Sequence, residues 1–453
     1  MTPFRPEDIE TIRLRLRELV QDGESSEIRE LLQELHPSDV ADLVEALDTE
    51  EEQVVLMEAL PADLASETLA EMDEEEDPGD ILAALDPKRG AELLRELDYD
   101  DAVDLVAELE PEERARLLAA LPLEEAGEIR GLLRYHEESA GGLMDTLLVR
   151  VESTLSAGQA IAEVRRQGRE VEDFYTVFVV DEGQHLLGTM PLDDLILADP
   201  LLPVIELVEP VVASVLPDED QEEVGRLMSR YNLVSIPVVD QFGLLLGRIT
   251  FDDVLDVMEA EQTEDILLLA GTSDQEELRG GWVETVQTRL PWLFLNLLTA
   301  TMGASVVYYF SETLENVIVL AAIMPVVAGL GGNAGTQALA VTVRRLALES
   351  GLGSSRFSAV FKELLVGIVN GAVLGGVVAT VAAVIGGDPK LGLVVFLAMC
   401  GNQAAAGFAG SLFPTILDRA GIDPAVASSV FVTALTDLLG FLFLLGLATA
   451  LLL

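Results

Sequence analysis

The chain has 453 residues, which is longer than one hydrophobic core usually serves, so two or more domains are expected. It carries 80 acidic and 27 basic side chains, a formal net charge of −53. This charge argues against nucleic acid as a partner, because binding phosphates requires a basic surface. The single cysteine, Cys400, excludes a disulfide framework within one chain and agrees with a reducing cytosol for the soluble part.

The charge is concentrated in the first two thirds of the chain. Residues 1 to 290 hold 72 of the acidic and 21 of the basic side chains, a net charge of −51. Such a segment repels itself unless cations neutralise it. Two explanations stay open: the acids bind cations, or they form a well-solvated surface of the halophile kind, which the presence of only three lysines also fits.

Residues 1 to 135 are predicted to form an all-α solenoid. Residues 1 to 30 have helical apolar spacing and indicate a single amphipathic helix, and their alternating charges differ from the apolar core of a signal peptide. Segments of 12 or 13 residues then repeat, each opening with Pro, Asp or Glu and closing with a Leu-rich turn. They begin at His36, Asp48, Asp86, Asp98 and Glu110. Such repeats stack as short helices, with leucines in the core and acids outside.

A second repeat, with a period of 59 residues, follows the solenoid. FVVDEGQHLLGTMPLDDLI matches IPVVDQFGLLLGRITFDDVL, which aligns Asp181, Gly188 and Asp194 with Asp240, Gly247 and Asp253. Each copy has a helix, two Val-rich strands around a turn and a closing helix, and we assign the copies to residues 136–200 and 201–262. The repeat resembles a tandem pair of CBS domains, α/β modules that often bind adenine nucleotides. Nucleotide binding and a purely structural role are both open here.

Residues 263–290 are predicted to form a connecting helix, interrupted by Gly271, Gly280 and Gly281. Residues 291–453 then contain five apolar stretches, each longer than the roughly 20 residues that cross a bilayer. The stretches cover residues 291–310, 317–343, 361–386, 391–417 and 426–453. Basic residues gather before the first stretch, between the second and third, and between the fourth and fifth. The positive-inside rule therefore places the N-terminus in the cytoplasm and the C-terminus outside.

The last apolar stretch contains one carboxylate, Asp437. An acid inside a membrane segment is costly unless it faces water, a partner or an ion. The alternative is an acid near a helix end that reaches the interface, but apolar or small residues flank Asp437 on both sides. Ser429 and Thr433 precede it at helical spacing and share its face. We interpret this face as the centre of a cation path.

Other polar residues interrupt two further stretches. Met324 to Gln337 reads MPVVAGLGGNAGTQ, and its proline and glycines would weaken an ordinary helix. Broken backbone that lines water and close packing through small residues are both possible readings, and Asn333 favours a pore lining. Gly401 to Gln403 interrupt the fourth stretch. Carboxylate, carboxamide, hydroxyl and carbonyl oxygens suit Mg²⁺, which keeps several waters and takes one or two carboxylates.

The whole order of segments resembles the MgtE family of magnesium channels. The motifs EESAGGLM from Glu137, GGNAGTQ from Gly331 and DPAVASSVFVTALTD from Asp423 carry the resemblance, which covers nearly the whole chain. It implies a homodimer in the lipid bilayer with the pore on the two-fold axis. The acid that meets the hydrated ion would be Asp437, with Asn333, Ser429 and Thr433 lining the pore. Relatives often have Asn-Pro where this chain has Ser429 and Val430.

The resemblance also implies that cytosolic acids bind Mg²⁺ and close the pore when the ion is plentiful. The matching positions are Glu67, Asp100, Asp104, Asp220, Glu222, Asp253, Asp256, Glu261, Glu264, Asp265 and Asp423. Cations that bridge facing carboxylates would shift the equilibrium toward a compact, closed state. ATP in the CBS pair is left open, because Thr176 and Asp193 stand where an aromatic residue and an arginine would favour a nucleotide.

The sequence therefore predicts a multidomain protein: an all-α solenoid, an α/β tandem CBS pair, a connecting helix and a five-helix transmembrane domain. The predicted function is Mg²⁺ transport across the cell inner membrane down the electrochemical gradient, closed by Mg²⁺ bound to the acidic cytosolic domains. The alternative is a membrane-anchored cation or nucleotide sensor without transport. The sequence has no phosphate-binding loop and no nucleophile paired with a base, so an enzyme is not expected.

Overall fold

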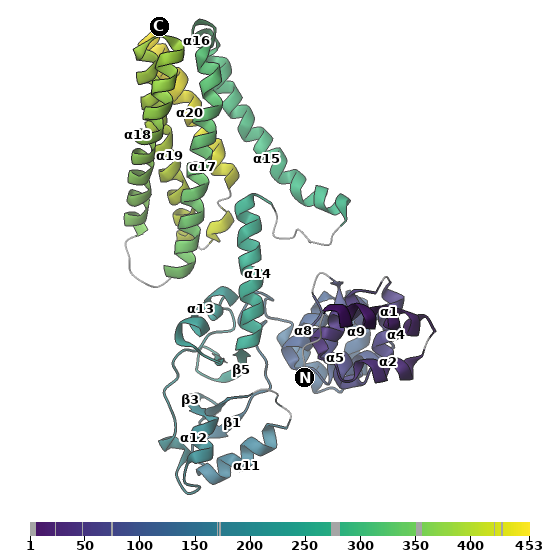
Figure 1. Cartoon of the computed structure of the whole chain (residues 1–453). Coiled ribbons are helices and arrows are strands. Elements are labelled where there is room, and N and C mark those ends of the chain that lie inside the picture. Colours follow the sequence, from purple (N-terminus) through teal and green to yellow (C-terminus); the bar gives the residue numbers. More distant parts are fainter. Residues whose placement is uncertain are drawn as a thin grey trace. The chain divides into compact units, whose positions relative to one another are not determined.

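The structure is a computed structural model, and it describes residues 6–22, 24–47, 49–73, 76–169, 171, 174–272, 281–349, 356–420, 422–426 and 429–453. Of these, the side chains of residues 6–11, 284, 348–349 and 356–357 are not described. The chain divides into two compact units, Met1–Ala260 and Glu261–Leu453. The first contains the solenoid and the α/β repeat, and the second contains the apolar helices (Figure 1).

Short helices in two layers make up the solenoid (Figure 1). The described helices are α1 (Pro6–Asp22), α2 (Ser25–Leu32), α3 (Pro37–Glu45), α4 (Glu50–Ala59), α5 (Ala62–Ala70), α6 (Pro78–Ala84), α7 (Pro87–Leu94), α8 (Tyr99–Glu108), α9 (Pro111–Ala120) and α10 (Glu125–Leu132). Helices two apart in the chain pack together, so α3, α5, α7 and α9 form one layer and α2, α4, α6, α8 and α10 the other. Leucines from both layers fill one core. The predicted all-α solenoid is confirmed.

The helix starts follow the sequence signals. Proline is the first residue of α3, α7 and α9, where its missing N–H has no helical partner to lose. The side chain of Thr49 accepts a hydrogen bond from the backbone N–H of Glu52 at 3.3 Å, and Asp86 accepts one from Lys88 at 2.9 Å. These caps begin α4 and α7 at the positions that the repeat indicates.

The expectation of one helix over residues 1 to 30 is wrong. Helix α1 ends at Asp22 and α2 begins at Ser25. The backbone N–H of Glu24 donates to the carbonyl of Leu19 at 3.1 Å, beyond the last turn of α1. Apolar residues of both helices, such as Leu16 and Ile28, enter the same core. The apolar periodicity therefore does not reveal the break.

Two α/β copies follow the solenoid. The first contains β1 (Arg150–Glu152), α11 (Ala157–Gln167), β2 (Thr176–Val180), β3 (Leu186–Pro191) and α12 (Leu192–Leu197). The second follows a 3₁₀ turn, η2 (Val204–Glu206), and contains α13 (Gln221–Tyr231), β4 (Ser235–Val239), β5 (Leu245–Thr250) and α14 (Phe251–Ala270). Strand β2 pairs parallel with β1 and antiparallel with β3. In the second copy β4 pairs antiparallel with β5, and Val215 makes a parallel bridge to Val238 where the first copy has β1.

Residues that the repeat aligns have the same contacts in both copies. Asp181 accepts two backbone N–H bonds of 2.8 Å within its hairpin turn, and Asp240 does the same. Gly188 and Gly247 each leave room for another backbone segment. A Cβ at Gly247 would lie 2.7 Å from the carbonyl oxygen of Asp145, and one at Gly188 would also collide with a backbone carbonyl. The internal repeat is thus a repeat of structure.

Five helices in the described part of the second unit are long and apolar enough to cross a membrane. They are α15 (Trp282–Tyr309), α17 (Val319–Glu349), α18 (Arg356–Gly386), α19 (Pro389–Ala420) and α20 (Ser429–Leu452), with short α16 (Ser311–Asn316) before α17 and a 3₁₀ turn, η3 (Pro424–Val426), before α20. The number of apolar helices agrees with the sequence prediction. Helix α15 begins at Trp282 rather than at Pro291, which lies inside it.

The connecting helix is not separate from the second α/β copy. Helix α14 runs without a break from Phe251 through Thr263 to Ala270. Gly271 follows with φ of +80°, a left-handed conformation that glycine adopts without strain and that ends the helix. Gly280 lies outside the described residues, and Gly281 directly precedes α15.

Of the two interpretations of the second stretch, the structure bears out close packing rather than broken backbone, and the polar residues of the fourth stretch do not break its helix either. Helix α17 continues through Met324 to Gln337, and α19 continues through Gly401 to Gln403. The glycines serve close packing instead: a Cβ at Gly335 would collide with the side chain of Val432 on α20, and one at Gly410 with the carbonyl oxygen of Gly335. Contact between helices thus outweighs the roughly 1 kcal/mol that each glycine costs a helix.

Candidate functional site

Helix α20 places Asp437 about midway between Pro424 and Leu452, the ends of its apolar stretch. The Asp437 side chain is half-buried and lines a pocket of about 390 Å³ between α20 and α15. Thr433, one helical turn earlier, lines the same pocket. Two of the predicted pore residues therefore line one pocket at mid-depth of the span, among mostly apolar neighbours.

The other two predicted pore residues, Asn333 and Ser429, are not part of the lining of this pocket. Asn333 is exposed on α17, and its neighbour Gly332 packs on α20, where a Cβ would lie 3.4 Å from Cγ2 of Thr433. Ser429 is the first residue of α20 and is half-buried. A Cβ at Gly271, just after α14, would lie 4.0 Å from the Ser429 hydroxyl. The end of α14 thus meets the start of α20.

Two buried carboxamides fix α17 against α19. Asn402 Nδ2 donates to the carbonyl of Val327, and Gln403 Nε2 donates to the carbonyl of Leu330, both at 2.9 Å. Their side chains are almost fully buried. The two bonds hold the glycine-rich part of α17 in place, so these residues have a structural contact rather than an exposed pore face.

Acidic side chains of the solenoid meet those of the second α/β copy inside the first unit. Asp100 at the start of α8 is 8% exposed. Its burial, together with the charges of Asp101, Asp145 and Asp253, raises its pKa well above the usual range. Burial also raises the pKa of Asp253, although two hydrogen bonds from Thr250 oppose the shift. Two predicted regulatory acids, Asp100 and Asp253, are therefore brought together at a crowded, partly buried contact.

Asp101 and Asp145 belong to the same contact. Burial and the charge of Asp253 raise the pKa of Asp101 to about 7. Burial and the charge of Asp98 raise the pKa of Asp145 to about 7, although Arg248 lies 3.5 Å from its carboxylate and opposes the shift. The acids from Asp98 to Asp101, with Asp145 and Asp253, are called the acidic contact below. Its carboxylates repel one another and favour a bound cation.

The remaining predicted acids of the first unit lie nearer to solvent. Asp256 follows Asp253 by almost one turn of α14, and burial together with the charge of Asp253 raises its pKa. Exposed side chains are found at Glu67, Asp104, Asp220 and Glu222. Asp220 accepts a hydrogen bond from the backbone N–H of Glu222 at 2.9 Å and begins α13.

A second pair of predicted acids meets in the other unit. Burial and the nearby charge of Asp423 raise the pKa of Asp265 on α14, while Arg344 opposes the shift. Asp423 is exposed and accepts a hydrogen bond from the backbone N–H of Ala425 at 2.9 Å. Glu261 and Glu264 are half-buried on the same helix as Asp265. The charge of Asp423 thus acts on Asp265 near the place where the end of α14 meets the start of the last span.

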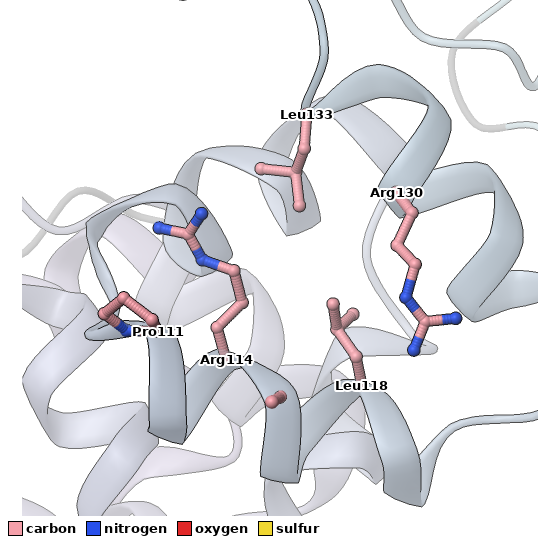
Figure 2. A pocket seen from close by; sticks show the side chains of 6 residues that line it. Pro111, Arg114, Leu118, Arg130 and Leu133 are labelled. Atoms are coloured by element: carbon pink, nitrogen blue, oxygen red, sulfur yellow. The ribbon is translucent and has the colours of Figure 1, made fainter.

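A pocket of about 350 Å³ in the solenoid has a different character (Figure 2). It lies between α9 and α10, and its lining has no acid. The Arg114 guanidinium donates to the carbonyls of Ala107 at 2.6 Å and Leu109 at 3.0 Å, which end α8. Arg130 extends on the other side of Leu118 (Figure 2). This basic and apolar lining does not suit a cation, and Arg114 is engaged in closing the preceding helix.

Family models match three regions of the chain. They describe a divalent cation transporter over residues 324–447, an MgtE intracellular N domain over residues 35–138 and a CBS domain over residues 204–260. The magnesium transporter MgtE of Thermus thermophilus is 38% identical over 449 residues, which cover 98% of this chain and 99% of that protein. The chain belongs to the MgtE family of magnesium transporters. The MgtE of Enterococcus faecalis is 36% identical over 434 residues, 96% of each chain.

Solved structures match a little over half of this MgtE family member. The soluble part of a magnesium transporter has a TM-score of 0.51 and 32% identity, and covers 56% of this chain and 99% of its own. The cytosolic domain of the Mg²⁺ channel MgtE in complex with ATP has a TM-score of 0.51 and 38% identity, and covers 54% and 99%. The predicted fold class and the predicted membership of a magnesium-transport family are confirmed. The family consists of transporters rather than enzymes.

The described part of this MgtE family member holds no closed metal cage. Within it, no three His, Cys, Asp or Glu side chains stand close enough together to hold a metal ion. Mg²⁺ dehydrates reluctantly and is usually held through one or two carboxylates and its own waters. Both candidate sites fit such binding. Asp437 offers one carboxylate beside a pocket with room for water, and the acidic contact offers several carboxylates close to one another.

Sequence reasoning missed several residues of these sites. Asp98 and Asp101 lie close to the predicted Asp100, and Asp145 directly follows the EESAGGLM motif. Closeness to these two features is the sequence signal that could have identified them. Asn296 and Thr299 of α15 line the Asp437 pocket. No pattern within α15 alone connects them to Asp437, because the pairing of α15 with α20 is a tertiary contact.

The acidic contact makes a prediction about pH. The folded-state pKa values of Asp101 and Asp145 are raised to about 7, so protonation stabilises the fold below that pH and this stability is lost as the pH rises through about 7. Without Mg²⁺, the fragment of residues 1–260 should be about 2 kcal/mol more stable at about pH 6 than at about pH 8. Thermal unfolding followed by circular dichroism should show a melting temperature about 5 °C higher at the lower pH.

Two comparisons make this test specific. Asp101→Asn should reduce the pH dependence by about half, whereas Asp80→Asn, an exposed acid on α6, should leave it unchanged. Saturating Mg²⁺ should also reduce it, because the ion replaces protons as the neutralising cation. Equal melting temperatures at both pH values would contradict the assignment of repelling acids to this contact.

Proposed function

We propose that this chain is a homodimeric Mg²⁺ channel of the cell inner membrane with its N-terminus in the cytoplasm. Mg²⁺ moves down its electrochemical gradient past Asp437, and Mg²⁺ bound to the cytosolic acids closes the path. The chain's membership of the family supports Mg²⁺ as the ion and transport as the activity. The direction of passage, the gate and the dimer are our proposal.

The observation that carries the conduction path is the cavity that Asp437 shares with Thr433. A carboxylate at mid-depth of a membrane span is retained where it meets water or an ion. The pocket of about 390 Å³ gives Asp437 such a space, and a hydroxyl lines it one turn away. Asn333 and Ser429 are proposed to line the same path, because Gly332, the neighbour of Asn333, packs on Thr433 and Ser429 begins α20.

The acidic contact supports the proposed gate. Several acids with raised pKa values are held together without enough bases to neutralise them, which costs free energy that a bound cation removes. A cation that binds the compact arrangement more tightly than the open one shifts the population toward it. Asp265 and Asp423 extend the proposed regulation to the start of the last span, because they repel each other there.

A nucleotide is not included in the proposed function. One solved structure is of the cytosolic domain of an MgtE channel in complex with ATP, and that observation is about the relative rather than about this chain. In this chain Thr176 begins β2 and Asp193 lies in the first turn of α12. Neither side chain can stack on a base as an aromatic ring does, and a carboxylate repels phosphate.

Flux of Mg²⁺ into proteoliposomes tests the proposal, with the free Mg²⁺ on the cytosolic face as the variable. The full chain should carry Mg²⁺ at low cytosolic Mg²⁺, and the flux should fall as cytosolic Mg²⁺ rises. A chain that lacks residues 1–135 should show a much smaller fall. Absence of flux from both proteins, while the soluble part still binds Mg²⁺, would favour the alternative of a membrane-anchored sensor.

A further inference from the structure

Helix α15 turns a stripe of small and polar residues toward α20. Its residues in the Asp437 pocket are Asn296, Thr299, Ala300, Gly303, Ala304 and Val307. They recur at intervals of three and four, so they lie on one face of the helix. Between Pro291 and Tyr309, Asn296 is the sole residue with a carboxamide or a charge. The pocket therefore receives the most polar side chain of that stretch.

Two contacts fix the register of α15 against α20. A Cβ at Gly303 would lie 3.5 Å from the Phe441 ring, and a Cβ at Gly446 would lie 3.9 Å from Phe310. The two contacts follow in the same order along both segments, so the helices run in the same direction. One turn before the contact of Gly303 with Phe441, Thr299 falls level with Asp437. About one turn earlier again, Asn296 falls level with Thr433. Each of the two polar α15 residues in the pocket, Asn296 and Thr299, thus has a polar counterpart on α20 at the same depth.

Asn296 lies near the middle of its apolar stretch, Thr285–Tyr309. The hydroxyls of Thr299, Thr301 and Ser305 donate to carbonyls of α15 itself, at 2.8 to 2.9 Å, so the helix satisfies them as donors. A carboxamide at this depth has more donors and acceptors than its own helix can satisfy, and leaving them in hydrocarbon is costly. The Asn296 carboxamide avoids this cost when it faces the pocket that Asp437 also lines and when that pocket contains water or an ion.

The volume indicates what those contents are. A water molecule occupies about 30 Å³ in the liquid, so an ion with six waters requires roughly 200 Å³. The pocket is partly open, with Asn296 exposed at its edge, and its volume of about 390 Å³ is sufficient for such an ion with its hydration shell intact. Side-chain oxygens on two sides then contact the waters rather than the metal, which suits an ion that dehydrates reluctantly.

We infer that Asn296 and Thr299 of α15 complete a site for a hydrated divalent cation, opposite Thr433 and Asp437 of α20. The carboxamide oxygen of Asn296 accepts hydrogen bonds from the ion's waters, and Asp437 supplies the charge. The inference rests on the proposed function, because it places the conducted ion at Asp437. Asn296 therefore sets the affinity for the hydrated ion, whereas Asp437 decides whether the ion enters at all.

The test is Mg²⁺ flux into proteoliposomes as a function of external Mg²⁺, with hexaamminecobalt(III), a rigid cation of the same shape as hydrated Mg²⁺, as a blocking probe. Asn296→Leu should raise the half-saturating Mg²⁺ concentration and the half-blocking probe concentration about tenfold, the effect of one lost hydrogen bond. Asn296→Asp should lower both concentrations, because the added negative charge attracts the cation. A purely structural role of Asn296 would not produce this decrease. Thr299→Val removes a hydroxyl at constant shape and should raise both more weakly.

Thr301→Val is the matched control, since Thr301 is exposed on α15, is not part of the lining and bonds to its own helix. It should leave both concentrations unchanged. If Asn296→Leu does not assemble, Asn296→Asp and Thr299→Val still decide. Unchanged half-saturation in these variants, while Asp437→Asn abolishes flux, would overturn the α15 site and leave the channel intact. Normal flux in Asp437→Asn would instead overturn the proposed path itself.

Discussion

Asp437→Asn should reduce Mg²⁺ flux into proteoliposomes at least about 100-fold, while the protein assembles as the wild type does. The carboxylate is half-buried in a cavity of the membrane domain, where its attraction for a divalent ion is screened much less than in water. Losing a few kcal/mol of this attraction accounts for the expected factor. The amide keeps the shape and costs less to bury than the carboxylate, so the fold should not suffer.

Two further variants make the Asp437 result specific. Asp437→Glu keeps the charge but moves it by one methylene, and should retain flux with an altered half-saturating concentration. Glu315→Gln removes an exposed acid from α16 and should leave flux unchanged. Size-exclusion chromatography of each variant reports assembly. Wild-type flux from an assembled Asp437→Asn protein would contradict the assignment of Asp437 to the path.

The sequence predicts the architecture well where one period dominates. Long apolar runs predict five spans because crossing a bilayer requires their length, and the short repeats predict stacked helices because their leucines recur. The errors lie at helix ends and breaks. The separation of α1 from α2 is not visible in apolar spacing. The continuity of α14 from Phe251 to Ala270 is hidden, because the boundary of the repeat suggests an end there.

Glycine shows why local propensity misleads inside a membrane. The GGNAG run of α17 contains residues that weaken an isolated helix, and broken backbone was a reasonable expectation. In the fold, the same glycines admit close neighbours such as Asn402 and Val432, and the helix stays whole. Propensity is a property of one segment, whereas this packing depends on two other helices. The sequence of α17 alone could not distinguish the two uses.

The candidate site shows the same division. Asp437 was visible because a single acid in an apolar run is rare, and Thr433 because it shares its helical face. Asn296 was not visible, because it belongs to a different helix whose register with α20 depends on contacts such as that of Gly303 with Phe441. Likewise Asp145 is an ordinary acid in sequence, and only its burial beside the solenoid makes it part of the acidic contact.

Asp100→Asn combined with Asp253→Asn should weaken the proposed closure of the channel by cytosolic Mg²⁺. The double variant removes two charges from the acidic contact, and the Mg²⁺ concentration that halves the flux should rise about tenfold or more. Maximal flux at low Mg²⁺ should stay at the wild-type level, because neither residue lies in the membrane domain. Proteoliposome flux against cytosolic Mg²⁺ measures both quantities. Asp80→Asn, an exposed acid of the solenoid, is the matched control and should not move the curve.

The same double variant should close less well and yet be more stable in the absence of Mg²⁺. This combination distinguishes the loss of a cation site from damage to the fold. Without Mg²⁺, removing repelling, buried charges should raise the melting temperature of residues 1–260 by several degrees, roughly 5 °C for about 2 kcal/mol. The further rise on adding Mg²⁺ should shrink, because a weaker site adds less binding free energy to the folded state. A variant that melts lower and also closes poorly would indicate a disrupted contact. A variant that melts higher and closes normally would show that these acids do not bind the regulating ion.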